Sequence, residues 1–174
     1  TPCTPGEYQS QTGQTQCLKC AADTYAAEMY AHNCTDCDPG EYAASGAASC
    51  IVCSAGQFQT TGSTGARACK QCPGGFFSAS PRQLACSGCP SGFMQPSALQ
   101  VSCLPCIPGT AQGSPNQTAC PLCLRDTFAS TKNLSACLPC DPGQTAAAGA
   151  PSCTDCGAGK YQAGNAGARV CTAC

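Results

Sequence analysis

The hydrophobic and polar positions of the chain follow no helical period. Apolar side chains do not recur every three to four residues in any window, so the pattern disfavours helices. Short stretches such as GEYAAS (residues 40–45) and GKYQAG (159–164) instead suit extended segments around a chain reversal, as in a two-stranded ribbon. We therefore predict irregular, hairpin-like loops with little strand and almost no helix.

The composition cannot support an ordinary hydrophobic core. Leu, Ile, Val and Phe make up about a tenth of the 174 residues, below the roughly 20% that a packed core requires. Burial worth about 25 cal/mol per Å² of apolar surface could not offset the conformational entropy of ordering such a chain. The 21 cysteines, about 12% of the residues, are typical of a disulfide scaffold. Covalent or metallic cross-links are therefore expected to supplement the core.

The charge pattern excludes several classes of partner. The net charge is −1 with only 10% charged residues, which gives no electrostatic reason to expect binding to nucleic acid or to an anionic membrane. The longest apolar runs are too short to span a bilayer. Because the sequence has neither an initiator Met nor a signal peptide, we expect it to be a segment of a longer protein.

A repeat of about 17 residues runs through the chain. Every cysteine except Cys3 belongs to a CxxC pair, at 17/20, 34/37, 50/53, 69/72, 86/89, 103/106, 120/123, 137/140, 153/156 and 171/174. Cys3 fits as the second member of a pair that begins before Thr1. Internal repeats of this kind indicate an array of small units, so we assign residues 1–174 to one continuous cysteine-rich repeat array.

Each repeat also carries a turn signal and a ring. The third residue after each pair is Gly in eight repeats and Asp in two, and both residue types tolerate a positive φ. In four repeats Pro precedes this Gly, the signature of a type II turn. The fifth residue after the pair is Tyr or Phe in seven repeats. We expect these rings to form a minimal core stacked on the cross-links, rather than a binding stripe.

Zinc and redox chemistry are the alternatives to a disulfide framework. Two adjacent pairs overlap the spacing of zinc ribbons, but a zinc site joins two pairs and would repeat near 34 residues, whereas this chain repeats at 17. A redox CxxC needs a helix N-terminus or cationic neighbours, which the repeats lack. His32 is the only histidine and is expected to be a surface residue. We therefore predict disulfides, no metal, no cofactor and no enzymatic activity.

Two disulfide patterns fit the cysteine spacing. In a uniform ladder, the second cysteine of one pair bonds the first of the next. The predicted bonds are Cys3–Cys17, Cys20–Cys34, Cys37–Cys50, Cys53–Cys69, Cys72–Cys86, Cys89–Cys103, Cys106–Cys120, Cys123–Cys137, Cys140–Cys153 and Cys156–Cys171, and they leave Cys174 over. The rival pattern joins first to first and second to second cysteines, giving two-repeat units. The uniform period favours the ladder, in which each loop of about 15 residues stabilises the fold by roughly 3 kcal/mol.

Three N-x-[ST] sequons, at Asn33, Asn116 and Asn133, are consistent with a secreted glycoprotein. Each is expected on a surface loop that could carry an N-linked glycan. Because disulfides persist in oxidising compartments, the sequence predicts an extracellular or cell-surface location.

The unit C-x-x-C-x-P-G-x-Y/F, followed by about eight residues before the next pair, resembles the ephrin-receptor-like cysteine-rich repeat. It is also similar to the first loop of tumour necrosis factor receptor modules. Residues 37–50, with Cys37-Asp38-Pro39-Gly40-Glu41-Tyr42, are the closest copy. The resemblance implies an elongated extracellular array and loop-closing connectivity. This chain repeats one loop ten times, whereas tumour necrosis factor receptors alternate different modules.

Two functions fit this sequence. The first is a structural glycoprotein segment, a disulfide-stapled rod in a coat, stalk or filament that contacts copies of itself or other protein chains. The alternative is a ligand-binding or adhesive ectodomain. Its mark would be a repeat that breaks the pattern, and residues 20–34, with Met29 and Tyr30 as candidate protein contacts, break it most. Residues 82–84 are a weaker candidate.

Overall fold

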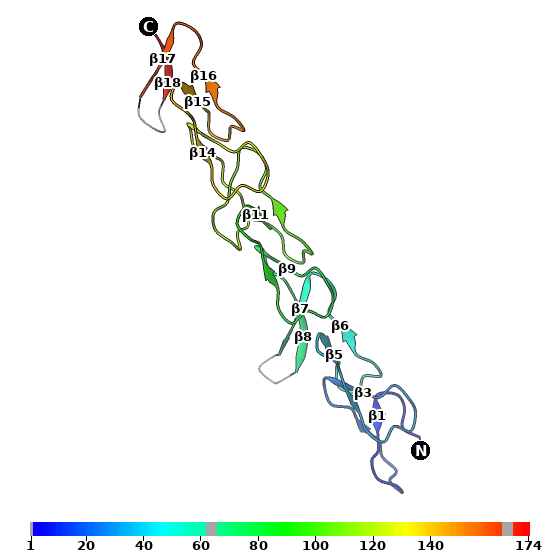
Figure 1. Ribbon diagram of the computed structural model, residues 1–174. Helices are drawn as coiled ribbons and strands as arrows, with labels where there is room; N and C mark the ends of the chain where they lie inside the picture. Colours follow the sequence, from blue (N-terminus) through cyan, green and yellow to red (C-terminus); the bar gives the residue numbers. More distant parts are fainter. Residues whose placement is uncertain (1, 62–65, 165–168) are drawn as a thin grey trace. The chain divides into compact units, whose positions relative to one another are not determined.

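A computed structural model of the chain describes residues 2–61, 66–164 and 169–174. The chain forms two compact units. The first unit contains residues 1–73, 77–87 and 98–101, and the second contains residues 74–76, 88–97 and 102–174. The ribbon in Figure 1 consists of short hairpins and loops in both units, and the described residues contain no helix.

Short strands are the regular elements of both units (Figure 1). They are β1 (Glu7–Tyr8), β2 (Leu18–Lys19), β3 (Thr24–Tyr25), β4 (Thr35–Asp36), β5 (Glu41–Tyr42), β6 (Ile51–Val52), β7 (Gln57–Thr61), β8 (Arg67–Gln71), β9 (Phe76–Phe77), β10 (Ser87–Gly88), β11 (Phe93–Met94), β12 (Leu104–Pro105), β13 (Thr127–Phe128), β14 (Leu138–Pro139), β15 (Gln144–Thr145), β16 (Thr154–Asp155), β17 (Lys160–Ala163) and β18 (Val170–Ala173). Within the first unit β1 pairs with β2, β3 with β4, β5 with β6 and β7 with β8, all antiparallel. Within the second unit the same holds for β11 with β12, β13 with β14, β15 with β16 and β17 with β18. The prediction of small hairpins with little strand is confirmed.

Disulfides close ten successive loops, which we number 1 to 10 along the chain. The bonded pairs in the structure are those of the uniform ladder, from Cys3–Cys17 to Cys156–Cys171. Loops 3 and 9 are the shortest, with a sequence separation of 13 between their cysteines, and loop 4 is the longest with a separation of 16. Cys174 is an exposed free thiol. We call the first cysteine of each loop its opening cysteine and the second its closing cysteine.

A tight turn follows each opening cysteine, as the sequence predicts. The third residue after each opening cysteine, which we call the turn residue, has a positive φ in all ten loops. These residues are Gly6, Asp23, Gly40, Gly56, Gly75, Gly92, Gly109, Asp126, Gly143 and Gly159. In loop 3 the Glu41 N–H donates to the Asp38 carbonyl at 3.1 Å and closes a four-residue turn with Pro39-Gly40 at its centre. This is the geometry that Pro-Gly favours.

The core of each loop is smaller than the sequence suggests. The rings five residues after the opening cysteine are half-buried in most loops and Tyr161 is exposed, so the prediction that they form the core is wrong. The opening cysteines of loops 1 to 9 are buried instead, and Cys156 of loop 10 is half-buried. A second buried position is the sixth residue after the opening cysteine, which we call the inner residue. It is a buried Ala or Ser in five loops: Ala26, Ala43, Ser78, Ala129 and Ala146. Successive side chains on a strand point to opposite faces, so a buried inner residue turns its neighbouring ring outward.

The backbone of the inner residue bonds both neighbouring loops, whether its side chain is small, as in Ala26, or a glutamine, as in Gln95 and Gln112. The N–H of the turn residue Gly6 donates to the carbonyl of the inner residue Ala26 in loop 2 at 2.8 Å. In the second unit the Gly92 N–H donates to the Gln112 carbonyl at 2.7 Å. The backbone N–H of the inner residue bonds the following loop, as when Gln95 of loop 6 donates to the Gln117 carbonyl of loop 7 at 3.0 Å. Within each unit the loops are therefore joined by a backbone ladder as well as by the covalent chain.

A second backbone conformation recurs from loop to loop at the residue four positions before the closing cysteine, which we call the tip residue. Its φ is positive in eight loops, at Gly13, Tyr30, Gly46, Arg82, Leu99, Asn116, Asn133 and Gly149. The tip N–H donates to the carbonyl of the opening cysteine in the preceding loop, for example from Gly46 to Cys20 at 2.8 Å. The tip carbonyl covers the turn glycine two loops back, so that a Cβ on Gly6 would lie closer than 3.0 Å to Gly46. One residue thereby ties three successive loops together.

Candidate functional site

The loop that breaks the sequence pattern, loop 2, presents an exposed apolar surface. Met29 is 58% exposed and Tyr30 is 65% exposed. A hollow of about 380 Å³ lies beside them, lined by residues 25–33 and Thr35, and His32 on its wall is exposed. The structure brings the two candidate contact residues, Met29 and Tyr30, together on one surface. What they contact stays a prediction.

The backbone of Tyr30 makes this surface unusual. Tyr30 is a tip residue with a φ of 64°, a conformation that Gly or Asn adopts at lower cost than a bulky side chain. Its N–H is used in stacking, because it donates to the Cys3 carbonyl at 3.2 Å. The ring contributes little to that contact and projects into solvent. Because Tyr30 combines backbone strain with an exposed aromatic ring, it is a candidate functional residue.

The second candidate, residues 82–84, is partly committed to internal contacts. Arg82 is also a tip residue, with a φ of 63°. Its guanidinium forms an ion pair with Glu41 at 2.6 Å and lies 3.7 Å from Asp38, so it joins loop 5 to loop 3 within the first unit. Leu84 remains exposed. Loop 5 therefore offers a smaller unpartnered surface than loop 2.

The three sequon asparagines are all exposed. Asn116 and Asn133 are tip residues with φ values of 61° and 67°. Their backbone N–H groups donate to Cys89 and Cys106, which leaves the side chains outside the ladder. Asn33 precedes the disulfide-bonded Cys34. N-glycosylation at these sites stays a prediction.

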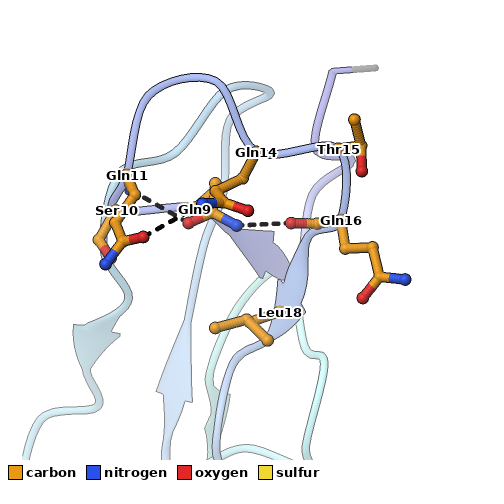
Figure 2. Close-up of a pocket in the computed structure, with 7 residues that line it drawn as sticks. All are labelled: Gln9, Ser10, Gln11, Gln14, Thr15, Gln16 and Leu18. Carbon is orange, nitrogen blue, oxygen red and sulfur yellow. Dashed lines mark hydrogen bonds between the residues drawn. The ribbon is translucent and has the colours of Figure 1, made fainter.

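Glutamine side chains that bond within loop 1 form a polar hollow there, and these side chains are not arranged as a ligand-binding site. Figure 2 shows this hollow of about 370 Å³, lined by residues 9–11, 14–16 and 18. The inner residue Gln9 spans the loop, because its Nε2 donates to the Gln16 carbonyl and its Oε1 accepts from the Gln11 N–H at 3.0 Å. Gln95 and Gln112 brace loops 6 and 7 in the same way. These amides already have partners, so the hollow is a by-product of loop bracing.

The chemistry of the remaining side chains is limited. Twenty of the 21 cysteines are in disulfides and cannot act as thiolate ligands or nucleophiles. Across residues 2–61, 66–164 and 169–174, no three His, Cys, Asp or Glu side chains are grouped as a metal site would need. None of these residues belongs to an apolar helix that could cross a membrane.

Two functional features were missed by reasoning from the sequence. The tip position could have been found, because Gly or Asn stands four residues before the closing cysteine in seven of the ten loops. The reason for Asp at two turn positions could not, because it depends on residues more than 40 positions away.

Comparison with known proteins agrees with the repeat pattern. The family described as tyrosine-protein kinase ephrin type A/B receptor-like matches residues 40–83 and 75–118. No curated protein shows significant similarity to the chain. This family is a cysteine-rich repeat of receptor ectodomains or structural proteins, typical of extracellular domains, and is not an enzyme family. The chain is thus a tandem array of disulfide-closed cysteine-rich loops, with ephrin-receptor-like repeats identified over residues 40–118.

Proposed function

We propose that this chain is a segment of an extracellular structural glycoprotein, a disulfide-stapled rod in a surface coat, stalk or filament. The observation that carries the proposal is the backbone ladder, in which turn, inner and tip residues of one loop bond its neighbouring loops, and the same bonds recur in successive loops. A repeating contact of this kind propagates along an array instead of closing on itself.

The distribution of stabilising contacts supports a mechanical role. Ten disulfides join cysteines at sequence separations of 13 to 16, and the ladder contacts reach one or two loops along the chain. The stability of the array is then the sum of the stability of each loop and the energy of its contacts with neighbouring loops, so loops can be added without enlarging a central core. The expected partners are other protein chains, including copies of itself, and N-linked glycans.

Small-angle X-ray scattering tests the rod. Loops advancing by about 10 to 17 Å each would give a segment roughly 100 to 170 Å long. Such a rod has a radius of gyration of roughly 30 to 50 Å, against about 16 Å for a compact globule of this length. A value near 16 Å for the monomer would contradict the proposal.

The second candidate, an adhesive or ligand-binding ectodomain, is favoured by one observation, the exposed Met29–Tyr30 surface on loop 2. Tyr30→Asn removes the ring while keeping a residue that tolerates the tip backbone, as Asn116 and Asn133 show. Leu99→Asn is the matched control, since Leu99 is an exposed tip residue in another loop.

Attachment of cells to a surface coated with the segment separates the two functions. Loss of attachment with Met29→Ala or Tyr30→Asn, but not with Leu99→Asn, would support adhesion. If the loop 2 variants instead shift self-association in sedimentation velocity, the structural role gains. Equal behaviour of all variants in both assays would remove loop 2 from either function.

A further inference from the structure

Two turn residues are Asp instead of Gly, and each stands two loops before one of the longest hairpins. Asp23 lies in loop 2, and loop 4 carries β7 and β8, of five residues each. Asp126 lies in loop 8, and loop 10 carries β17 and β18, of four residues each. In six other loops, from Gly6 to Gly109, the tip carbonyl from two loops ahead covers the turn glycine, which leaves no space for a side chain.

The Asp carboxylate contacts the long hairpin directly. Asp23 Oδ2 accepts the backbone N–H of Arg67 at 2.8 Å. Asp126 Oδ2 accepts the N–H of Arg169 at 2.9 Å. Both carboxylates therefore contact the loop two positions ahead, as the covered turn glycines do, but they do so through a charge-assisted hydrogen bond.

The arginine side chain bonds the same kind of acceptor that a tip residue bonds elsewhere, the carbonyl of an opening cysteine. Arg67 Nη1 donates to the carbonyl of the opening cysteine Cys37 at 2.9 Å. Arg169 Nη1 donates to Cys140 at 3.2 Å. In the neighbouring loops the same kind of acceptor receives a tip N–H, as Cys20 does from Gly46.

A glutamine at the inner position completes the set. The Oε1 of Gln59 accepts the Gly40 N–H at 3.2 Å and its Nε2 donates to the Glu41 carbonyl. Gln162 makes the same two bonds with Gly143, at 3.1 Å, and with Gln144. Elsewhere the turn N–H bonds the backbone carbonyl of the next inner residue, whereas the inner residues Gln59 and Gln162 are paired within their own hairpins.

We infer that these three side chains form a clasp, Asp–Gln–Arg, which supplies three contacts of the kinds that backbone groups make elsewhere in the ladder and positions one extended hairpin in every six loops. The clasp residues recur 102 to 103 positions apart, at Asp23, Gln59 and Arg67 and again at Asp126, Gln162 and Arg169. The surrounding sequence recurs as well, with CDPGxxAAxGAxSC at 37–50 and 140–153 and GARxC at 65–69 and 167–171. The array therefore has a second-order repeat of six loops, and loops 2 to 4 correspond to loops 8 to 10.

The two copies supply independent evidence for this reading. They lie in different compact units, yet the bonds that Asp, Gln and Arg make have the same donors and acceptors in both. Only the second carboxylate oxygen differs, since Asp23 Oδ1 accepts the Ala43 N–H at 3.5 Å and Asp126 Oδ1 is buried without a partner among the described residues. The two copies tolerate a difference in hairpin length, since the sequence separation of the bonded cysteines is 16 in loop 4 and 15 in loop 10. A clasp that fixes the base of a hairpin leaves the length of its far end free to vary. The hairpins are thus the elements in which the array can change sequence without losing its stacking.

Hydrogen exchange of the disulfide-intact chain tests the clasp. Asp23→Gly keeps a residue suited to the φ of 67° and removes the carboxylate, while Asp23→Asn keeps an acceptor oxygen. We expect Asp23→Gly to speed exchange in β8 about ten- to a hundred-fold, the effect of losing a bond to a charged group. Asp23→Asn should stay within about threefold of the unmodified chain, because an amide oxygen still accepts the Arg67 N–H.

Matched measurements make the outcome decisive. Asp36→Asn, on the exposed strand β4, is the control and should leave β8 unchanged. Arg67→Lys should speed exchange in loops 3 and 4, because a point charge cannot keep the Nη1 geometry while the backbone bond to Asp23 remains. Unchanged exchange of β8 in Asp23→Gly would overturn the inference. Equal acceleration in Asp23→Gly and Asp23→Asn would overturn the acceptor role, and peptide mapping that shows the ten disulfides intact excludes misfolding as the cause.

Discussion

Replacing the turn glycine Gly56 by alanine should destabilise the stack more than the same change at Gly143. Both glycines have nearly equal φ values, 82° and 85°, so the cost of placing alanine in this conformation, about 1 to 2 kcal/mol, is shared. They differ in their surroundings. A Cβ on Gly56 would lie 2.6 Å from the Leu99 carbonyl oxygen, whereas among the described residues no atom would come within 4 Å of a Cβ on Gly143.

The difference between the two variants therefore measures the interloop contact alone. Overpacking of this kind costs about 1 to 3 kcal/mol, because the Leu99 backbone has to move while its N–H is held by the Cys72 carbonyl. At roughly 1.4 kcal/mol per factor of ten, the amides of loops 4 and 6 should exchange about five- to a hundred-fold faster in Gly56→Ala than the amides of loop 9 in Gly143→Ala.

Hydrogen exchange followed by mass spectrometry on the disulfide-intact chain is the appropriate assay, since a repeat array need not unfold in a single two-state transition. Each variant is compared with the unmodified chain, loop by loop. If both alanine variants accelerate exchange by the same factor, the close approach of tip and turn residues does not stabilise the stack, and the ladder described above is wrong.

Three further outcomes are expected. Gly92→Asp should disrupt loops 6 and 8, although Asp is native at position 126, because the Asn133 carbonyl covers Gly92; normal exchange in this variant would contradict that reason. Arg82→Gly should be less destabilising than Arg82→Ala by about 1 kcal/mol, since both lose the ion pair with Glu41 but only Gly relieves the positive φ; the reverse order in chemical denaturation would refute this. Replacing both Cys37 and Cys50 by Ser should cost roughly 3 kcal/mol and loosen loops 2 to 4 while loop 8 is unaffected, and global unfolding would show that the loops are not independent.

Much of the loop anatomy could be predicted from sequence because it is local. The period of the cysteine pairs gives the number of loops, and Pro39-Gly40 and its equivalents give the turns, since φ preference is a property of single residues. The position of the rings could not be predicted in this way. Tyr42 faces outward because its neighbour Ala43 has to accommodate backbone from another loop, and this contact is invisible in a single repeat.

The features that relate one loop to another also escaped prediction for a physical reason. Asp23 looks like a permitted alternative to Gly when judged by φ alone. Its role depends on Arg67, whose backbone N–H it accepts from a position 44 residues further along the chain. Met29 and Tyr30, in contrast, could be identified from the sequence because loop 2 departs from the repeat pattern, and the structure places both on the surface.

Non-reducing tryptic mapping tests the central claim, loops closed by neighbouring cysteines, most directly. Lys19 is exposed and lies between Cys17 and Cys20, so trypsin can cut between the two members of a pair. In the uniform ladder, residues 1–19 leave as a separate peptide that contains one internal disulfide, Cys3–Cys17. In the rival pattern Cys17 bonds Cys34, so residues 1–19 stay covalently attached to the peptide that begins at Cys20 until reductant is added. Release of residues 1–19 without reductant is the predicted result, and their retention would contradict the account.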